Sequence, residues 1–159
     1  MIIVVMGVSG VGKTTVAAAL ARRLGWAFVE ADELHPRANV EKMARGEALD
    51  DEDRAPWLEA VAQRMAGMED GVVACSALKA KYREVLGREG KDVRFVLLDA
   101  PVAVIRERIE GRKGHFMPAA LLDSQVATLE RTAELVVVDA TRGVDEVVDE
   151  IVRRLGLRG

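Results

Sequence analysis

The residues from Gly7 to Thr14 constrain this chain more than any other segment, because they match the pattern G-x-x-x-x-G-K-[ST]. An apolar run at Ile2–Met6 precedes the pattern, and an amphipathic stretch at Lys13–Leu24 follows it. A strand, a glycine-rich turn and a helix in this order form a phosphate-binding loop, or P-loop. Its backbone N–H groups turn toward phosphate oxygens, and the helix N-terminus adds a positive dipole end. The pattern predicts a site for a nucleoside triphosphate.

Each residue type in this loop has an expected role. We expect Lys13 to reach the β and γ phosphates and the Thr14 hydroxyl to ligate Mg²⁺. A P-loop alone does not distinguish a kinase from a switch or a motor. The nucleotide-binding set predicted here is Gly7, Val8, Ser9, Gly10, Val11, Gly12, Lys13, Thr14 and Thr15.

Short apolar runs alternate with helical patterns along the whole chain. Strands that are apolar nearly throughout indicate a parallel sheet covered by helices on both faces. We find no repeat, low-complexity segment or linker, so residues 1–159 are expected to form one α/β domain. The expected strands are 2–6, 27–30, 72–75, 93–98 and 135–138, and the expected helices are 13–24, 36–43, 57–68, 78–86 and 144–155, with further helices opening near 101 and 118.

Composition and charge exclude several classes of function. A single cysteine, Cys75, rules out an intrachain disulfide, and its apolar surroundings favour a core position. The formal net charge of −3 argues against nucleic acid or an anionic membrane as the main partner. No segment approaches the roughly 18 consecutive apolar residues that a membrane span needs. The sequence therefore predicts a soluble cytoplasmic protein.

A carboxylate follows the second expected strand, beside the P-loop. Asp32 lies at the carboxyl end of this strand, where ligands bind in open α/β sheets. Such a carboxylate can hold Mg²⁺ through water, or accept the proton of an attacking hydroxyl. A helix cap is the alternative for Asp32, and a packing residue at a helix start is the alternative for His35.

Cationic side chains suggest a second, anion-binding site. Lys79 and Arg83 are four residues apart on an expected helix and hence on one face, and Arg54 follows an acidic segment. A solvated basic face or surface ion pairs are the alternatives. Arg108 and Arg112 precede a glycine-containing turn, as in a lid that brings positive charge to a transferring phosphoryl group. Arginines that complement a helix dipole are the alternative there.

Three longer strings are more specific than the P-loop: Asp32-Glu33-Leu34-His35-Pro36, Ser76-Ala77-Leu78-Lys79 and Gly114-His115-Phe116-Met117-Pro118. With these strings the sequence resembles the gluconate kinases of the small P-loop type, and the similarity covers roughly residues 2–130. This resemblance implies ATP-dependent phosphorylation of D-gluconate at its 6-hydroxyl, with Mg²⁺. It also implies the fold of shikimate kinase, with sheet order 2-3-1-4-5, a lid at about residues 112–125, and a homodimer.

The resemblance also implies roles for single residues. Asp32 would be the base or the carboxylate that orients the hydroxyl, Arg108 would lie near the adenine, and Arg112 would be the lid arginine that acts with Lys13 in catalysis. The residues implied to hold gluconate, together with Asp32, are His35, Arg54, Lys79, Arg83, His115 and Gln125. The segment 130–134 lacks the proline pair that is usual in the family, which affects the local loop geometry expected there.

Two other functions stay open at this point. One is another small-molecule kinase of the same fold, such as a shikimate or nucleoside kinase, although Ser76-Ala77-Leu78-Lys79 stands where a shikimate kinase has a triple glycine. The other is a non-catalytic module that binds ATP and regulates a partner. Turnover of ATP that depends on gluconate separates both from a gluconate kinase.

Overall fold

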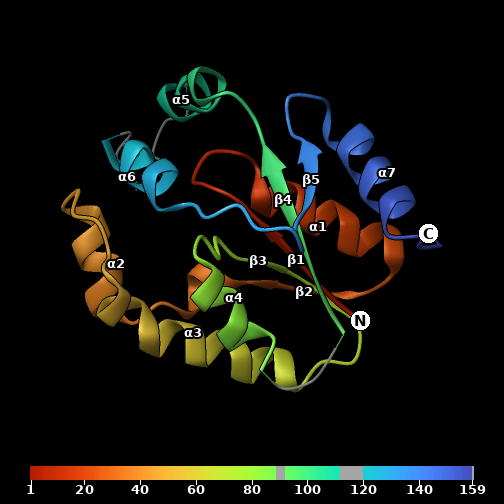
Figure 1. Ribbon diagram of the computed structural model, residues 1–159, viewed down its shortest axis with the longest axis horizontal. Helices are drawn as coiled ribbons and strands as arrows, with labels where there is room; N and C mark the ends of the chain where they lie inside the picture. The colour runs from red at the N-terminus through yellow and green to blue at the C-terminus, as the bar shows by residue number, and fades with distance from the viewer. Residues whose placement is uncertain (89–91, 112–119, 159) are drawn as a thin grey trace.

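The strand β1 (Ile2–Met6) lies at the centre of a parallel sheet, because its five side chains are apolar and fully buried. The computed structural model describes residues 1–88, 92–111 and 120–158 (Figure 1). Within these ranges the sheet has five strands in the order β2-β3-β1-β4-β5, all paired in parallel, which confirms the expected order. The other strands are β2 (Ala27–Glu30), β3 (Gly71–Ala74), β4 (Val93–Asp99) and β5 (Val136–Asp139).

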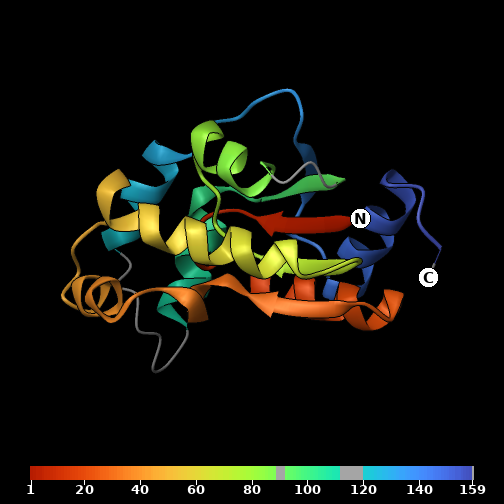
Figure 2. The ribbon, with the colours of Figure 1, turned by 90° about the horizontal axis from the view of Figure 1, so that it is seen from below.

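Helices cover both faces of this sheet (Figures 1 and 2). Alternate side chains of β1 point to opposite faces. Ile3 and Val5 pack on the face covered by α1 and α7, whereas Ile2, Val4 and Met6 pack on the face covered by α3 and α4. The helical elements are α1 (Lys13–Leu24), a 3₁₀ turn η1 (Ala31–Leu34), α2 (Arg37–Ala44), α3 (Asp51–Ala66), α4 (Ala80–Leu86), α5 (Val102–Glu110), α6 (Ala120–Thr128) and α7 (Val144–Arg154).

The start of α3 differs from the sequence-based prediction. The helix was expected to begin at residue 57, but it begins at Asp51 because the acidic segment before it forms a capping box. The Asp50 carboxylate accepts a hydrogen bond from the Asp53 N–H over 2.7 Å, and the Asp53 carboxylate accepts one from the Asp50 N–H over 3.0 Å. Pro56 then lies inside the helix, in its second turn.

The start of α4 corrects a second prediction. The helix was expected from residue 78, which would place Lys79 and Arg83 on one helical face. It begins instead at Ala80, and Lys79 is the N-cap residue in extended conformation. The two cations therefore do not form a joint face of α4.

The P-loop joins β1 to α1 through a backbone that needs glycine. Gly10 has φ +85° and Gly12 has φ +104°, both in the left-handed region. A Cβ atom on Gly10 would lie 2.5 Å from Cγ1 of Ile109 in α5, so this glycine also allows close packing. The lid expected at 112–125 overlaps residues 112–119, which lie outside the described ranges. Across the described residues, no helix has the length and apolar character that a membrane span requires.

Candidate active site

One pocket opens beside the P-loop, at the carboxyl edge of the sheet. Its lining residues come from the P-loop, η1, α3 and α6. More than a hundred residues of sequence separate the P-loop from α6. We call it the Asp32 pocket. It brings together residues that the sequence assigned to nucleotide, hydroxyl and acid binding: Ser9, Lys13, Asp32, His35, Arg54 and Gln125. The Gln125 Oε1 atom accepts a hydrogen bond of 2.6 Å from the Ser9 N–H, which ties α6 to the P-loop.

Two side chains at the start of α1 face the end of β2. The Lys13 ammonium donates to the Val8 carbonyl over 3.1 Å, and the Thr14 hydroxyl donates to the Glu30 carboxylate. Burial raises the pKa of the Glu30 carboxyl above its ordinary value, although the Thr14 hydrogen bond opposes this shift. Sequence reasoning gave Glu30 no role. Its position as the last residue of β2, at the carboxyl edge of the sheet where the P-loop also lies, was the signal that could have found it.

These oxygen atoms suit a Mg²⁺ ion. Thr14 Oγ1 and the Glu30 carboxylate lie together, and Asp32 follows two residues later with an exposed carboxylate. Mg²⁺ prefers oxygen ligands and is usually held by one or two protein groups plus phosphates and waters. In the described part of the chain no group of three or more His, Cys, Asp or Glu residues could hold a metal ion.

A second pocket, of about 160 Å³, lies on the other side of the P-loop between α1, α5 and α7. Thr15 and Arg108, two of the residues predicted to bind the nucleotide, both line it. The Arg108 guanidinium donates to the Val11 carbonyl over 3.1 Å and to the Ala140 carbonyl over 2.9 Å. Arg108 thus joins the P-loop to the segment that follows β5.

His35 has a fixed position in the Asp32 pocket. Its ring stacks on Trp57 with centroids 4.2 Å apart and an angle of 13° between the planes. The Trp57 indole N–H in turn donates to the Ala31 carbonyl over 2.8 Å. Burial lowers the pKa of His35 to about 4, Asp32 opposes this shift, and Arg54 adds to it. Trp57 is buried, and its hydrogen bond to Ala31 also holds the segment that carries Asp32.

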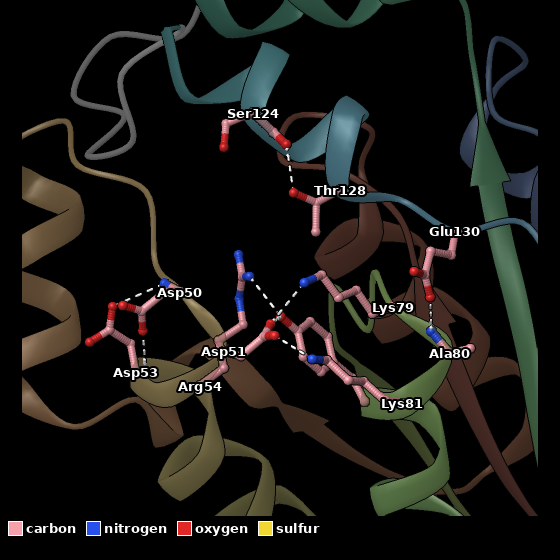
Figure 3. Close-up of polar contacts among 11 residues, drawn as sticks. Asp50, Asp51, Asp53, Arg54, Lys79, Ala80, Lys81, Ser124, Thr128 and Glu130 are labelled. Carbon is pink, nitrogen blue, oxygen red and sulfur yellow. Dashed lines mark hydrogen bonds and ion pairs between the residues drawn. The ribbon is translucent and has the colours of Figure 1, made fainter.

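The cations Arg54 and Lys79 belong to a polar cluster between α3 and α4 (Figure 3). Asp51 is its centre: its carboxylate accepts from Lys79 over 2.9 Å, and also from Lys81 and Tyr82. Hydrogen bonds from Lys81, Tyr82 and Lys79 hold the pKa of Asp51 well below its usual range. Arg54 donates to the Tyr82 hydroxyl over 3.1 Å, and in Figure 3 Arg54 extends toward α6, whereas the Lys79 ammonium points at the Asp51 carboxylate.

Arg83 lies elsewhere. Its side chain is 2% exposed and does not line the Asp32 pocket. The guanidinium donates to the Ala77 carbonyl over 2.7 Å, the Glu130 carbonyl over 2.8 Å, the Thr132 hydroxyl over 2.9 Å and the Glu134 carboxylate over 3.4 Å. These bonds fasten α4 to the segment after α6, the same segment that lacks the proline pair. Arg112 and His115, expected in the lid, lie outside the described residues.

Comparisons with known proteins relate this chain to gluconokinases. A family model described as an AAA domain matches residues 2–135. The chain is 47% identical over 158 residues to a gluconokinase of Gluconobacter oxydans, a match that covers 95% of this chain and 89% of the relative. It is 41% identical over 155 residues to the thermoresistant gluconokinase of Escherichia coli, with coverage of 92% and 89%.

Solved structures agree with these relatives. A gluconokinase from Sinorhizobium meliloti superposes with a TM-score of 0.88 at 45% identity, over 97% of this chain and 90% of that one. A shikimate kinase from Aquifex aeolicus gives a TM-score of 0.70 at 21% identity, over 98% and 96%. The second likeness shows only that the fold is shared.

The low pKa of His35 predicts how stability depends on pH. The folded-state value of about 4 lies below the ordinary value of 6.5, so the unfolded chain binds a proton that the folded chain does not. The neutral His35 ring contributes fully to the free energy of unfolding above pH 6.5, and this contribution is lost as the pH falls through 4. Between about pH 7 and pH 4.5 we expect the free energy of unfolding to fall by about 2–3 kcal/mol less in the His35→Asn variant than in the wild-type protein.

Urea unfolding of both proteins at the two pH values measures this difference. The second histidine, His115, is present in both and cancels from the comparison. Equal changes in the free energy of unfolding for the two proteins would contradict a buried, neutral His35.

The surroundings of Arg83 predict a loss of stability on substitution. Arg83→Lys keeps the charge but cannot reach all of the oxygen atoms that the planar guanidinium contacts. We expect the free energy of unfolding to fall by about 2–4 kcal/mol. The control is Arg88→Lys, which changes a half-exposed arginine paired with Glu59 and should cost less than about 0.5 kcal/mol. Similar small losses for both variants would show that Arg83 does not fasten the segment after α6.

Proposed function

Because the chain belongs to the gluconokinase family, we propose that it transfers the γ-phosphoryl group of ATP to the 6-hydroxyl of D-gluconate. The observation that carries this proposal is the Asp32 pocket, in which a P-loop lysine, a carboxylate and an arginine line one space. The lysine can bind the phosphate donor, the carboxylate can orient the attacking hydroxyl, and the arginine can bind the carboxylate of an acidic substrate.

The P-loop side of the pocket holds the donor. Lys13 and the backbone N–H groups of the loop bind the β and γ phosphates, and Thr15 and Arg108 line the side where the nucleoside lies. Mg²⁺, when bound, neutralises charge on the β and γ phosphates, and the oxygens of Thr14, Glu30 and, through water, Asp32 suit it. Arg112 would add positive charge from the lid, in keeping with the family pattern.

The opposite side of the pocket holds the acceptor. Asp32 aligns the 6-hydroxyl with the γ phosphorus and accepts its proton as the new P–O bond forms and the bond to ADP breaks. Arg54 binds the carboxylate at the other end of gluconate, where charge-assisted hydrogen bonds are strong, and Lys79 lies beside it. Gln125 supplies a polar contact to the hydroxyls between these ends, His35 lies beside Asp32, and His115 would join them from the lid.

Two alternatives receive less support. The likeness to shikimate kinases is at 20–21% identity and indicates fold alone. A regulatory module that only binds ATP does not require acceptor-binding residues, whereas this pocket places Arg54 and Asp32 opposite Lys13. The family resemblance also predicts a homodimer, which stays a prediction.

The proposal predicts an acceptor-dependent reaction. ADP release by the purified protein with MgATP should rise strongly with gluconate and not with shikimate, glycerate, glucose or nucleosides. Asp32→Asn should lower kcat with gluconate by about 10²-fold or more, because the proton acceptor is lost. The matched control Glu33→Gln removes the neighbouring, exposed carboxylate and should leave kcat near wild type.

Stimulation by shikimate or a nucleoside instead would keep the fold and overturn the substrate. ATP binding without stimulation by any acceptor would overturn the enzyme and favour the regulatory module. Equal losses in Asp32→Asn and Glu33→Gln would remove the assigned role of Asp32.

A further inference from the structure

Asn39 is a buried polar residue beside the Asp32 pocket, and nothing in the proposed function uses it. It lies in the first turn of α2 and is 4% exposed. Among the described residues, Asn39 and Arg83 are the polar or charged residues that are buried. A buried amide is costly unless its hydrogen bonds are made, so the partners of Asn39 indicate what it does.

The amide nitrogen of Asn39 has two partners. It lies 2.9 Å from the carbonyl oxygen of Asp53, next to the capping box of α3, and 3.2 Å from Nδ1 of His35. A carbonyl oxygen only accepts hydrogen bonds, so the Asn39 atom that faces it must be the NH₂ nitrogen. This nitrogen has a second hydrogen for His35 and no lone pair to offer.

The tautomer of His35 follows from this contact. Nδ1 must accept the hydrogen bond from Asn39 and therefore has no proton of its own, so the proton of the neutral ring lies on Nε2. Nε2 is 3.9 Å from the Oδ1 atom of Asp32. Ordinary N–H···O hydrogen bonds span about 2.7–3.2 Å, so a shift of about 1 Å by either side chain completes one.

The opposite tautomer would act against Asp32. With the proton on Nδ1, the lone pair of Nε2 would face a carboxylate, which also offers only lone pairs. The stack on Trp57 fixes the plane of the ring but leaves the choice of nitrogen open. Of the contacts made by His35, the one with Asn39 decides where the proton lies.

We propose that Asn39 is a positioning residue for phosphoryl transfer: it fixes His35 as the Nε2–H tautomer, whose N–H then holds the Asp32 carboxylate in place. The proposal rests on the assigned role of Asp32 in the transfer to gluconate. Asn39 itself touches neither substrate. Its effect reaches the reaction through His35, at the end of the pocket where the hydroxyl is aligned.

Nitrogen-15 NMR of the histidine rings tests the tautomer directly, and it does so independently of any activity. The chain has two histidines, and the spectrum of His35→Asn identifies the signals of His35. At neutral pH we expect a protonated Nε2 and an unprotonated Nδ1 in the wild-type protein. A proton on Nδ1, or on both nitrogens, would overturn the proposal without bearing on whether the protein phosphorylates gluconate.

Substitution tests the consequence. Asn39→Asp keeps the shape but replaces the NH₂ donor with an acceptor, so the proton of His35 should move to Nδ1. We expect kcat with gluconate to fall about ten- to a hundredfold, as when other groups that orient a histidine are removed, while KM for ATP changes less than about twofold. The control Val40→Asp puts the same charge on the exposed face of α2 and should leave both constants near wild type.

A double-mutant cycle separates this effect from a merely structural one. If Asn39 acts through His35, Asn39→Asp should cost little further kcat in a protein that already has His35→Asn. Additive losses would overturn the proposal, as would equal losses in kcat and in binding of ATP. If Asn39→Asp does not fold, Asn39→Ala serves in the same cycle, with the NMR result on the wild-type protein still decisive.

Discussion

The burial of β1 on both faces is the constraint on which the rest of this structure depends. Its five apolar side chains contact α1 and α7 on one face and α3 and α4 on the other, so the strand cannot shift without exposing one core. The P-loop begins where β1 ends, and its glycines turn the backbone toward the edge at which β2 and β3 also end. Phosphate-binding groups and the Asp32 segment therefore meet because the central strand fixes both.

The acceptor side of the pocket depends on contacts between side chains and backbone. The Trp57 indole holds the Ala31 carbonyl, its ring supports His35, and Asn39 links His35 to the start of α3. These contacts join η1, α2 and α3 into one support beneath Asp32. Arg54 extends from the same helix that contributes Trp57, so α3 both carries Arg54 and supports the segment that carries Asp32.

The sequence predicted best those parts whose signals are local. The bounds of β1, α1 and β2 agree with the prediction because apolar runs, the P-loop pattern and Gly25 mark them within a few residues. The predicted start of α3 was wrong because the acidic segment 50–54 was placed before the helix, whereas the reciprocal bonds of Asp50 and Asp53 begin the helix at Asp51. The pattern of residue types does not show whether such side-chain to backbone hydrogen bonds form, because they depend on the backbone conformation.

Long-range partners were the other limit of prediction from sequence. The spacing of Lys79 and Arg83 indicated a shared face, but Lys79 contacts α3 whereas Arg83 is enclosed by the segment after α6. Glu30 and Asn39 gave no signal as single residues, since their roles come from neighbours that the fold brings close. The P-loop pattern and the family resemblance thus found several of the residues that line the pocket, but not the contacts that hold them in place.

The position of the new phosphate ester tests the central claim most directly, because the proposal places the reacting hydroxyl at the Asp32 end of the pocket and the carboxylate of gluconate at Arg54. Proton-coupled phosphorus-31 NMR of the product from MgATP and gluconate reads this position. An ester on the terminal CH₂ group couples to two protons, and we expect the resulting triplet. A doublet from a secondary hydroxyl, or inorganic phosphate alone, would contradict the account.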